Sequence, residues 1–304
     1  MAADAQAIAI GFFSILAVLL GVPGNTAVIV SICRTRNLLR NNHYYLLLHL
    51  AICDLVHLIF FIDDIYTVFN NTGVSSNSRI LCKIWSPTYT SCFIAGVYFL
   101  VLISVSRYRA IVQPFKPPIS RKLLKIYSAS VYIIAVLCII PYALVLKFDE
   151  SQGASICYEQ WPFQSLNIVY TVFLAVVQYL MPVAFLSVVY FKICKKLVIQ
   201  SKIVNGHKLR QQSNGPRKNR KTFLVCCIIV ICFTISAFPT QVAWMISAIT
   251  SSETSGYISW FKPFNVLRVF GASVINPYVY GAFDNKVFSF FFGCRLRLSR
   301  VKML

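Results

Sequence analysis

Hydrophobic residues fall into long unbroken runs along this chain, and charged residues are confined to the stretches between them. Two runs contain one charge each, Asn41–Ile62 with Asp54 and Pro263–Phe283 with Arg268. Five further runs carry no charge: Ala5–Cys33, Ile84–Ser106, Ile126–Leu146, Gln160–Phe191 and Thr222–Ser252. A helix needs roughly 20 apolar residues to cross ~30 Å of hydrocarbon, and backbone polar groups in lipid must be hydrogen-bonded within the protein. The pattern therefore predicts seven membrane-spanning helices.

Composition supports an all-α membrane protein. The chain is 58% hydrophobic and only 12% charged, whereas soluble domains carry about a quarter charged residues. Disorder is excluded because it requires low hydrophobicity. A transmembrane β-barrel is excluded because its strands would alternate polar and apolar residues over about ten positions.

Basic residues are distributed unevenly between the two sides of the predicted bundle. The segments after helices one, three and five, together with the tail, hold 24 basic residues and one acid, whereas the opposite side holds 4 basic and 7 acidic residues. Because cytoplasmic loops are enriched in Lys and Arg, we expect a plasma-membrane protein with its N-terminus outside and its C-terminus in the cytoplasm. The first helix would then act as its own insertion signal, without a cleaved signal peptide. Most of the net charge of +20 comes from these cytoplasmic basic residues, which are attracted to the anionic lipid of the inner leaflet. Nucleic-acid binding is therefore not expected.

Of the 11 cysteines, only Cys82 and Cys157 fall on the oxidising side. They predict one disulfide, which would tie the loop between helices four and five to the outer end of helix three. The sequence contains no CxxC pair or His/Cys cluster, so a metal site is not expected. Asn70-Asn71-Thr72 is a glycosylation sequon at Asn70.

Polar residues inside the predicted helices are candidates for function, because ionisable groups are costly in a membrane. Asp54 lies midway along helix two, with Asn25, Ser273 and Asn276 at comparable depth. Asp54 is either a hydrogen-bonded structural residue or an ion-binding or proton-sensitive switch. Both readings stay open at this stage.

Four of the predicted helices contain a proline, namely Pro141, Pro182, Pro239 and Pro277. Each proline removes a backbone hydrogen bond and introduces a kink. In helix seven the proline stands in Asn276-Pro277-Tyr278-Val279-Tyr280. In helix three, Cys82 and Arg107 are 25 residues apart, or ~37 Å at 1.5 Å per residue. One helix would therefore carry a disulfide outside and an arginine inside.

Six motifs in order, at matching spacing, resemble the rhodopsin-like (class A) G-protein-coupled receptors of the peptide-receptor-like group, over essentially the whole chain. They are Gly24-Asn25 with Val28, Leu50-Ala51-x-x-Asp54-Leu55, Cys82 with Ser106-Arg107-Tyr108, Pro182 with Tyr190, Phe233 with Pro239, and Asn276-Pro277-x-x-Tyr280. Phe283 through Phe292 resembles the family's short amphipathic eighth helix, followed by Cys294 as a palmitoylation site. The implied organisation is an extracellular N-terminus (1–6), a seven-transmembrane domain (7–283), and a cytoplasmic eighth helix with a short tail (284–304).

The resemblance implies that an extracellular ligand drives activation of a heterotrimeric G protein through a two-state helical bundle. Arg107 would meet the G protein, with Tyr108 beside it, and Tyr190 and Tyr280 would rearrange. Near Pro277, a sodium ion would be held in the inactive state by Asp54, Ser273 and Asn276. No other cofactor is expected.

Several positions depart from the family's pattern. Ser106 replaces the acid that usually precedes the arginine, and Asn219 stands at the position of the acid on helix six, so we hypothesise raised basal signalling. Ala237 stands where a tryptophan is usual, so Phe233 or Phe238 would take its role. Gly96 and Ala272 replace polar residues of the sodium site, which is therefore incomplete.

Analogy with the family places eight residues in the ligand pocket: Tyr89, Thr90, Phe93, Gln178, Thr240, Gln241, Trp244 and Val266. For each of them, ordinary packing between helices is the alternative. Tyr89 argues against a monoamine ligand and Phe270 against a retinal Schiff base. The outer loops are acidic and include Asp63 and Asp64 at the rim. Because a negative mouth concentrates cations, a basic neuropeptide is the leading ligand, and a small non-peptide ligand is the alternative.

A transporter and an intramembrane enzyme are the two alternatives to a receptor. A transporter would favour paired repeats and several charges at mid-membrane depth, and the two halves of this chain show no matching hydropathy. An intramembrane enzyme would need an aspartate pair, a Ser/His set or a zinc motif, and none is visible. We therefore expect a receptor and no enzymatic activity.

Overall fold

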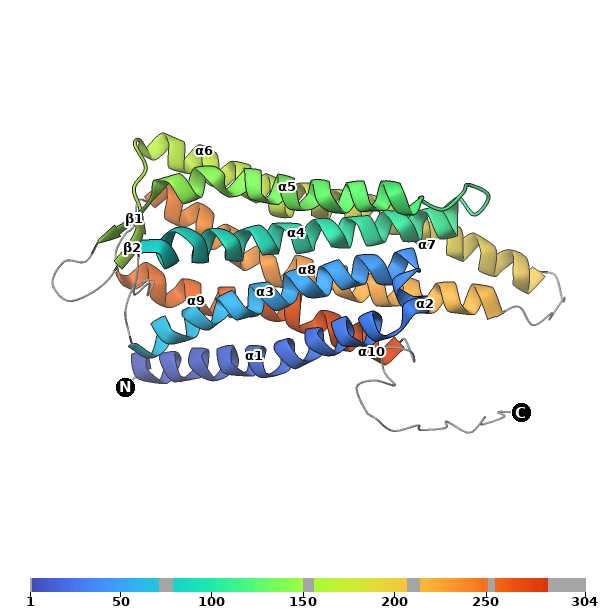
Figure 1. Ribbon diagram of the computed structural model, residues 1–304, viewed down its shortest axis with the longest axis horizontal. Coiled ribbons are helices and arrows are strands. Elements are labelled where there is room, and N and C mark those ends of the chain that lie inside the picture. Colours follow the sequence, from blue (N-terminus) through green and yellow to red (C-terminus); the bar gives the residue numbers. More distant parts are fainter. Residues whose placement is uncertain (1, 71–78, 150–155, 207–213, 251–254, 284–304) are drawn as a thin grey trace.

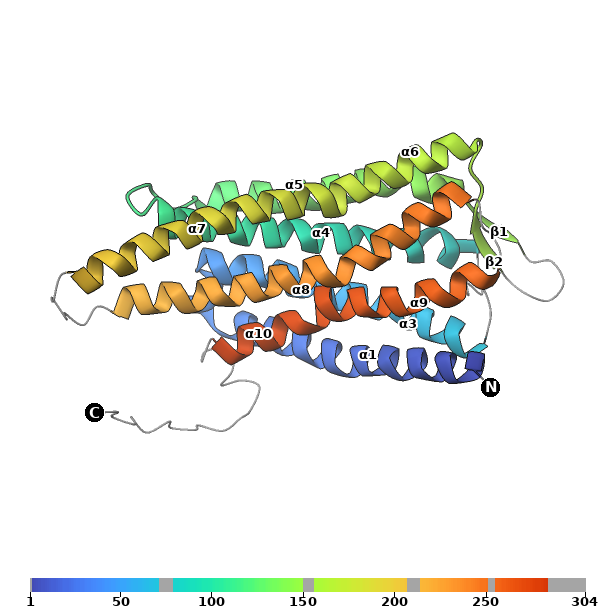
Figure 2. The ribbon, with the colours of Figure 1, turned by 180° about the vertical axis from the view of Figure 1, so that it is seen from behind.

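The computed structural model describes residues 2–70, 79–149, 156–206, 214–250 and 255–283. Long helices lie side by side as a bundle of rods in both views (Figures 1 and 2). The first four rods are α1 (Ala2–Arg34), α3 (Asn42–Asn70), α4 (Arg79–Val112) and α5 (Arg121–Val145), and the short α2 (Arg36–Leu39) connects α1 to α3. The fifth rod begins as α6 (Gln164–Ala175) and continues through the π-helical turn η2 (Val176–Leu180) into α7 (Met181–Gly206). The last two are α8 (Asn214–Thr250) and α9 (Ser255–Val269), which continues through a second π-helical turn, η3 (Phe270–Val274), into α10 (Ile275–Phe283).

Seven rods in the described ranges confirm the predicted bundle. Six of them contain helices that are long and apolar enough to cross a membrane. The seventh, at 255–283, is divided by η3 and carries Lys262 and Arg268. The rods extend beyond the uncharged runs at several ends: α1 begins at Ala2, within the segment expected to lie outside the membrane, and α8 begins at Asn214.

The outer surface of the bundle is strongly apolar, as expected for a lipid-facing surface. Phe12, Ile133, Leu144 and Ile235 are each 59% exposed or more. The interior instead contains buried aromatic and aliphatic side chains together with a set of buried polar residues. Because a soluble bundle would place its polar residues outside, this distribution agrees with a multi-pass membrane protein.

Two short strands lie at the same end of the bundle as the N-terminus (Figure 1). Strand β1 (Leu146–Asp149) pairs antiparallel with β2 (Ile156–Glu159), and Phe148 stands opposite Cys157. Cys157 forms the predicted disulfide with Cys82 near the start of α4. The hairpin was not predicted from the sequence, because strands of four residues give little periodic signal. It is held against α4 at the end that carries the acidic segments.

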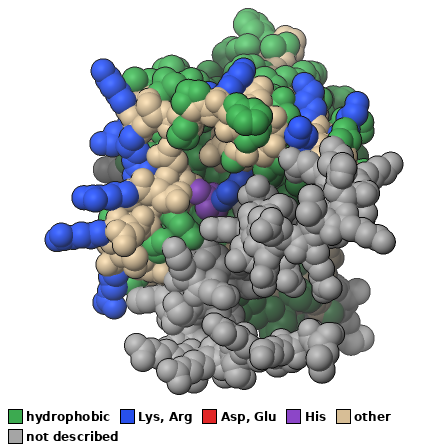
Figure 3. Space-filling model, turned by 90° about the vertical axis from the view of Figure 1, so that its right-hand side faces the viewer, with side chains coloured by type: hydrophobic (Ala, Val, Ile, Leu, Met, Phe, Trp, Pro, Cys, Tyr) green, Lys and Arg blue, Asp and Glu red, His purple; other side chains and the backbone are tan. Residues whose placement is uncertain are grey.

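The opposite end of the bundle is basic. Figure 3 shows Lys and Arg side chains around this end, and no Asp or Glu among the side chains that it colours. Arg121 at the start of α5 ties the connection after α1 in place: its guanidinium donates to Asn42 Oδ1 at 3.3 Å and lies 4.0 Å from the centroid of the Tyr45 ring. The charge asymmetry predicted from the sequence therefore separates the two ends of the folded bundle.

Carbonyl groups near the prolines are hydrogen-bonded by side chains from other helices. Asn25 of α1 donates to the Ser273 carbonyl, four residues before Pro277, at 3.0 Å. Three tyrosine hydroxyls act similarly: Tyr98 on the Val177 carbonyl before Pro182, Tyr179 on Thr234 before Pro239, and Tyr278 on Leu20 before Pro23, at 2.8–3.1 Å. Backbone groups freed in a membrane helix need such partners. The Ser273 carbonyl is the one that Pro277 leaves without an intrahelical donor, and Val177 is the equivalent for Pro182 in the π-helical turn η2, where the bonds span five residues. The bonds to Thr234 and Leu20 link neighbouring helices close to a proline.

Candidate functional site

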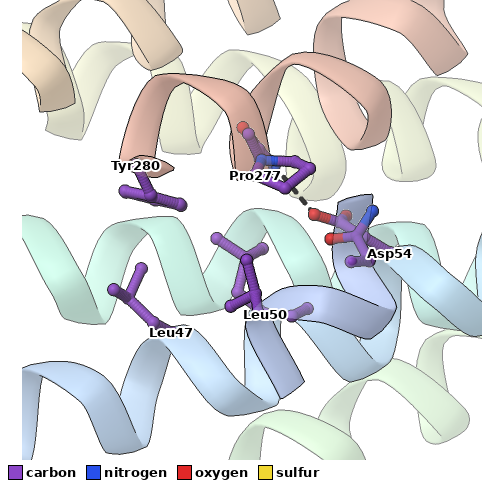
Figure 4. A pocket seen from close by; sticks show the side chains of 9 residues that line it. Leu47, Leu50, Asp54, Pro277 and Tyr280 are labelled. Carbon is purple, nitrogen blue, oxygen red and sulfur yellow. Dashed lines mark hydrogen bonds between the residues drawn. The ribbon is translucent and has the colours of Figure 1, made fainter. Parts of the chain in front are cut away.

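A buried polar cluster surrounds Asp54 in the middle of the bundle. The Asp54 side chain is 4% exposed. Ser273 Oγ in η3 donates to Asp54 Oδ1 at 3.0 Å, and Asn276 Nδ2 in α10 donates to Oδ2 at 2.8 Å. Figure 4 shows the carboxylate of Asp54 facing the segment that contains Pro277. The structure thus joins three of the sequence-predicted residues, and Asp54 lies more than 200 positions before the other two in the chain.

Asn25 belongs to this cluster through the backbone rather than through the carboxylate. Its Nδ2 donates to the carbonyls of Gly21 and Ser273, both at 3.0 Å. Close approach of α1 to α10 makes this contact geometrically feasible: a Cβ placed on Gly24 would lie 2.9 Å from Cγ of Pro277. A larger residue at position 24 would push the two helices apart.

His57 extends the cluster by one helical turn and was not among the predicted site residues. Its Nδ1 lies 3.0 Å from Ser273 Oγ. Ser273 has one hydroxyl proton and donates it to Asp54, so the serine oxygen accepts from an Nδ1–H of His57. The other ring nitrogen, Nε2, is buried without a hydrogen-bond partner. His57 follows Asp54 by three residues and so lies on the same face of the helix, which was the signal available in the sequence.

The described oxygen atoms form an incomplete site for a sodium ion. Asp54, Ser273 and the unpartnered Oδ1 of Asn276 supply side-chain oxygens, but Gly96 and Ala272 supply none. Hard cations take roughly six or more oxygen ligands. Ser273 also already bridges Asp54 and His57. We therefore assign no functional step to a bound ion.

A second buried cluster lies closer to the hairpin end and is centred on Arg268, which is 5% exposed. Arg268 Nη2 donates to the Tyr89 hydroxyl at 2.8 Å and to Asn265 Oδ1 at 2.7 Å, and its Nε donates to the same amide oxygen at 3.2 Å. The guanidinium carbon lies 4.4 Å from the centroid of the Phe93 ring. The Tyr89 ring in turn stacks on His57 at 4.3 Å between centroids. Arg268 and Asn265 were not predicted as pocket residues, although the lone charge in helix seven was visible in the sequence.

The remaining predicted pocket residues are occupied by contacts within and between helices. Gln178 Nε2 in η2 donates to Gln241 Oε1 in α8 at 3.2 Å, while the Gln178 Oε1 atom is buried without a partner. Thr240 donates to the Phe264 carbonyl and Thr90 to the Ser86 carbonyl. Trp244 lies near the Phe261 ring, and Val266 is buried with Tyr89 alongside. Of the predicted set, the structure brings Tyr89 and Phe93 together around Arg268.

Small residues allow α8 and η3 to pack closely where a tryptophan was expected. Ala237 is fully buried beside Phe233, Phe93 and Tyr179. Phe233 thus occupies the interior, whereas Phe238 is 56% exposed on the outer surface. A Cβ placed on Gly271 would lie 1.9 Å from Ser236 Oγ and 2.9 Å from the Cys232 carbonyl oxygen. Only glycine fits at this contact between α8 and η3.

A third cluster lies toward the basic end and contains the predicted G-protein-coupling residues. The hydroxyls of Tyr190 in α7 and Ser104 in α4 are 2.9 Å apart. The Tyr280 hydroxyl is buried without a hydrogen-bond partner, as is Nε of Arg107. Tyr108 packs against a separate apolar group around Ile193. The structure therefore places three of the four predicted residues around the interior, and Tyr108 beside it.

Two groups of packed residues meet at Tyr280. One joins Tyr280 to Asp54 and includes Leu47 and Leu50 (Figure 4). The other joins Tyr280 to Tyr190 and also includes Ser104 and Cys226. Neither group encloses space for a water molecule. The Tyr280 ring therefore packs between the Asp54 cluster and the residues toward the basic end.

Some predicted residues lie outside the described residues or have side chains that are not described. The eighth helix and Cys294 belong to the first group. The side chains of Asp63, Asp64, Asn70 and Asn219 belong to the second.

Comparison with known proteins gives a consistent set of similarities. A family model described as "7 transmembrane receptor (rhodopsin family)" matches residues 24–280. The chain is 27% identical over 279 residues to Neuropeptide FF receptor 2 of Rattus norvegicus, which covers 86% of this chain and 66% of the relative. It is 25% identical over 269 residues to Neuromedin-K receptor of Mus musculus, which covers 87% of this chain and 58% of the relative. The chain thus spans roughly two thirds or less of the length of these curated relatives.

Proposed function

Because the chain belongs to the rhodopsin family of seven-transmembrane receptors, we propose that it converts binding of an extracellular peptide into activation of a heterotrimeric G protein. The family consists of receptors rather than enzymes. The observation that carries the proposal is the arrangement around Tyr280, whose buried hydroxyl has no hydrogen-bond partner and whose ring packs between the Asp54 cluster and Tyr190. A hydroxyl left without a partner here would gain a hydrogen bond in a second arrangement of the helices, as a two-state switch requires.

The basic end is the proposed docking surface for the G protein. Arg107 lies near Tyr280, and its Nε is buried without a partner. In the described part of the chain, no carboxylate forms an ion pair with Arg107, and the preceding residue is Ser106 rather than an acid. Arg107 is half-buried and has no counter-ion among the described residues, and we propose that a docking partner supplies the missing acceptor. This end faces the cytoplasm in the orientation proposed from the charge bias.

A peptide ligand is supported by the names of the similar proteins, which include two neuropeptide FF receptors and a neuromedin-K receptor. We further propose that the ligand carries basic residues, because the outer side holds 7 acids against 4 bases. Asp149 and Glu159 of the hairpin are the members of that set whose side chains the structure describes. Glycosylation of Asn70 and palmitoylation of Cys294 are proposed from their sequence motifs alone.

Nucleotide exchange on a purified G protein tests the signalling proposal. The full chain is reconstituted in lipid nanodiscs, and basal exchange is compared for the parent protein and Arg107→Ala. We expect a parent rate above that of the G protein alone, and a fall to that background in the variant, since the docking cation is lost. A matched control is Arg109→Ala, in which a neighbouring arginine that bonds the Pro117 carbonyl is removed. Equal exchange in Arg107→Ala and the parent would remove Arg107 from this role.

A further inference from the structure

Arg268 is a buried cation whose described partners are all neutral. They are the Tyr89 hydroxyl, the Asn265 amide and two aromatic rings. Arg268 makes no ion pair with any residue that the structure describes. Charged side chains within membrane proteins are normally paired, because an isolated charge in low dielectric is costly. The positive charge of Arg268 is therefore solvated by dipoles but has no counter-ion among these residues.

One edge of the guanidinium makes no hydrogen bond to the residues that the structure describes. The hydrogen bonds of Arg268 come from Nε and Nη2, and Nη1 donates to no residue in the described ranges. An arginine presents its donors as a planar fork that matches the two oxygens of a carboxylate. The neighbouring Tyr89 is only half-buried. Arg268 thus keeps a donor for an additional acceptor.

The position of Arg268 in the bundle suits a ligand that enters from the hairpin end. Tyr89 lies seven residues from Cys82, or ~10 Å along α4 from the disulfide. The guanidinium carbon of Arg268 lies 4.4 Å from the centroid of the Phe93 ring, and His57 stacks on Tyr89. The Nε2 atom of His57 is buried without a hydrogen-bond partner. Through His57, which also contacts Ser273, the Arg268 cluster is joined to the Asp54 network.

We propose that Arg268 anchors a carboxylate of the ligand, and this proposal rests on the proposed receptor function. The carboxylate would supply the missing counter-ion, while the Tyr89 and Phe93 rings contact the apolar part next to it. A peptide that carries basic residues at the rim would then insert a carboxylate-bearing end toward Arg268. This ligand is zwitterionic, with its positive part at the acidic hairpin end and its negative part inside the bundle.

A matched pair of small probes tests the charge directly. N-acetylphenylalanine and N-acetylphenylalaninamide differ only in a carboxylate against a carboxamide. Each is titrated to about 20 mM against the purified full chain in nanodiscs, and the shift in unfolding temperature is recorded. Since charge-assisted hydrogen bonds are roughly twice as strong as neutral ones, we expect the acid to half-saturate at a concentration at least about tenfold lower than the amide.

Variants separate the charge from the rest of the cluster. Arg268→Gln should abolish the preference for the acid, Arg268→Lys should retain part of it, and Tyr89→Phe should keep it because the cation remains. Arg109→Gln, which removes a guanidinium at the basic end, should leave the preference unchanged. These measurements need no G protein, so failure of the exchange assay leaves them interpretable.

Three results would overturn the proposal. The first is equal half-saturation of the parent protein by the two probes, and the second is no shift with either probe at 20 mM. The third is an acid preference that survives in Arg268→Gln. The first two depend only on the parent protein and apply even where a variant does not fold.

Discussion

Gly271→Ala is the substitution whose cost can be worked out most directly from the structure. The new methyl group would lie 1.9 Å from Ser236 Oγ, 2.4 Å from Ser236 Cβ and 2.9 Å from the Cys232 carbonyl oxygen. The last atom belongs to the backbone of α8, so rotation of a side chain cannot remove the clash. Forcing extra volume into a packed interior costs about 1–3 kcal/mol. Against this, alanine gains up to about 1 kcal/mol over glycine in a helix.

We therefore expect a net loss of about 1–2 kcal/mol in the free energy of unfolding, or a fall of a few degrees in unfolding temperature. Gly96→Ala is the matched control. It is the same chemical change at another buried helical glycine, but its methyl group would meet Asp54 Oδ1, Leu50 and Cys53 at 3.7–3.9 Å, which is ordinary contact. That variant should unfold at the parent temperature or slightly above it.

The assay is thermal unfolding of the purified protein in nanodiscs, with Ser236→Gly as the partner change. Combining Gly271→Ala with Ser236→Gly removes both Ser236 atoms from the clash and should recover part of the loss. Equal unfolding temperatures for Gly271→Ala and Gly96→Ala would refute the close α8–η3 contact. A double variant no more stable than Gly271→Ala would exclude Ser236 as the clashing residue.

Three further predictions concern other parts of the bundle. Ser106→Asp supplies a carboxylate next to Arg107, so basal nucleotide exchange should fall about two- to tenfold, as expected for a partly exposed ion pair; an unchanged rate would contradict the hypothesis that the serine raises basal signalling. Asn25→Leu leaves the Ser273 carbonyl without its donor and should lower the unfolding free energy by about 1–3 kcal/mol, whereas Ser187→Ala, which removes an exposed hydroxyl bonded within its own helix, should have no effect. Burial raises the pKa of the Glu159 carboxyl, against the opposing hydrogen bond from the Trp161 indole; the folded state therefore favours the protonated form, and stability should decline as the pH rises from about 4.5 through the raised value. Glu159→Gln should flatten that part of the profile of unfolding temperature against pH, and an unchanged slope would mean that another group titrates.

The seven rods and the disulfide could be predicted because they follow from solvation and compartment. The absence of charge between Ile84 and Ser106 requires a crossing wherever in the bundle that helix packs, and Cys82 and Cys157 are the two cysteines on the oxidising side. Asp54, Ser273 and Asn276 were grouped correctly because they share a depth in the membrane.

The parts that the sequence did not predict depend on direction around a helix axis. Depth alone could not show whether Arg268 points toward lipid, toward Asp54 or, as observed, toward Tyr89 and Asn265. Seven crossings without an alignment do not define which faces meet, so the hydrogen bond between Gln178 and Gln241 could not be predicted, although both residues were named for the pocket. The π-helical turn η3 shifts the register of helix seven by one residue, and periodicity does not reveal such a shift.

The hydrogen bonds to carbonyls near the prolines have a mechanical consequence. Tyr98 of α4 bonds the Val177 carbonyl before Pro182, and Tyr179, in that same rod, bonds the Thr234 carbonyl before Pro239. Asn25 and Tyr278 form a reciprocal pair between the first and last rods. A rod that moved alone at one of these contacts would leave a hydroxyl or an amide of its neighbour without an acceptor. The rods joined in this way therefore change position at a lower cost together than one at a time.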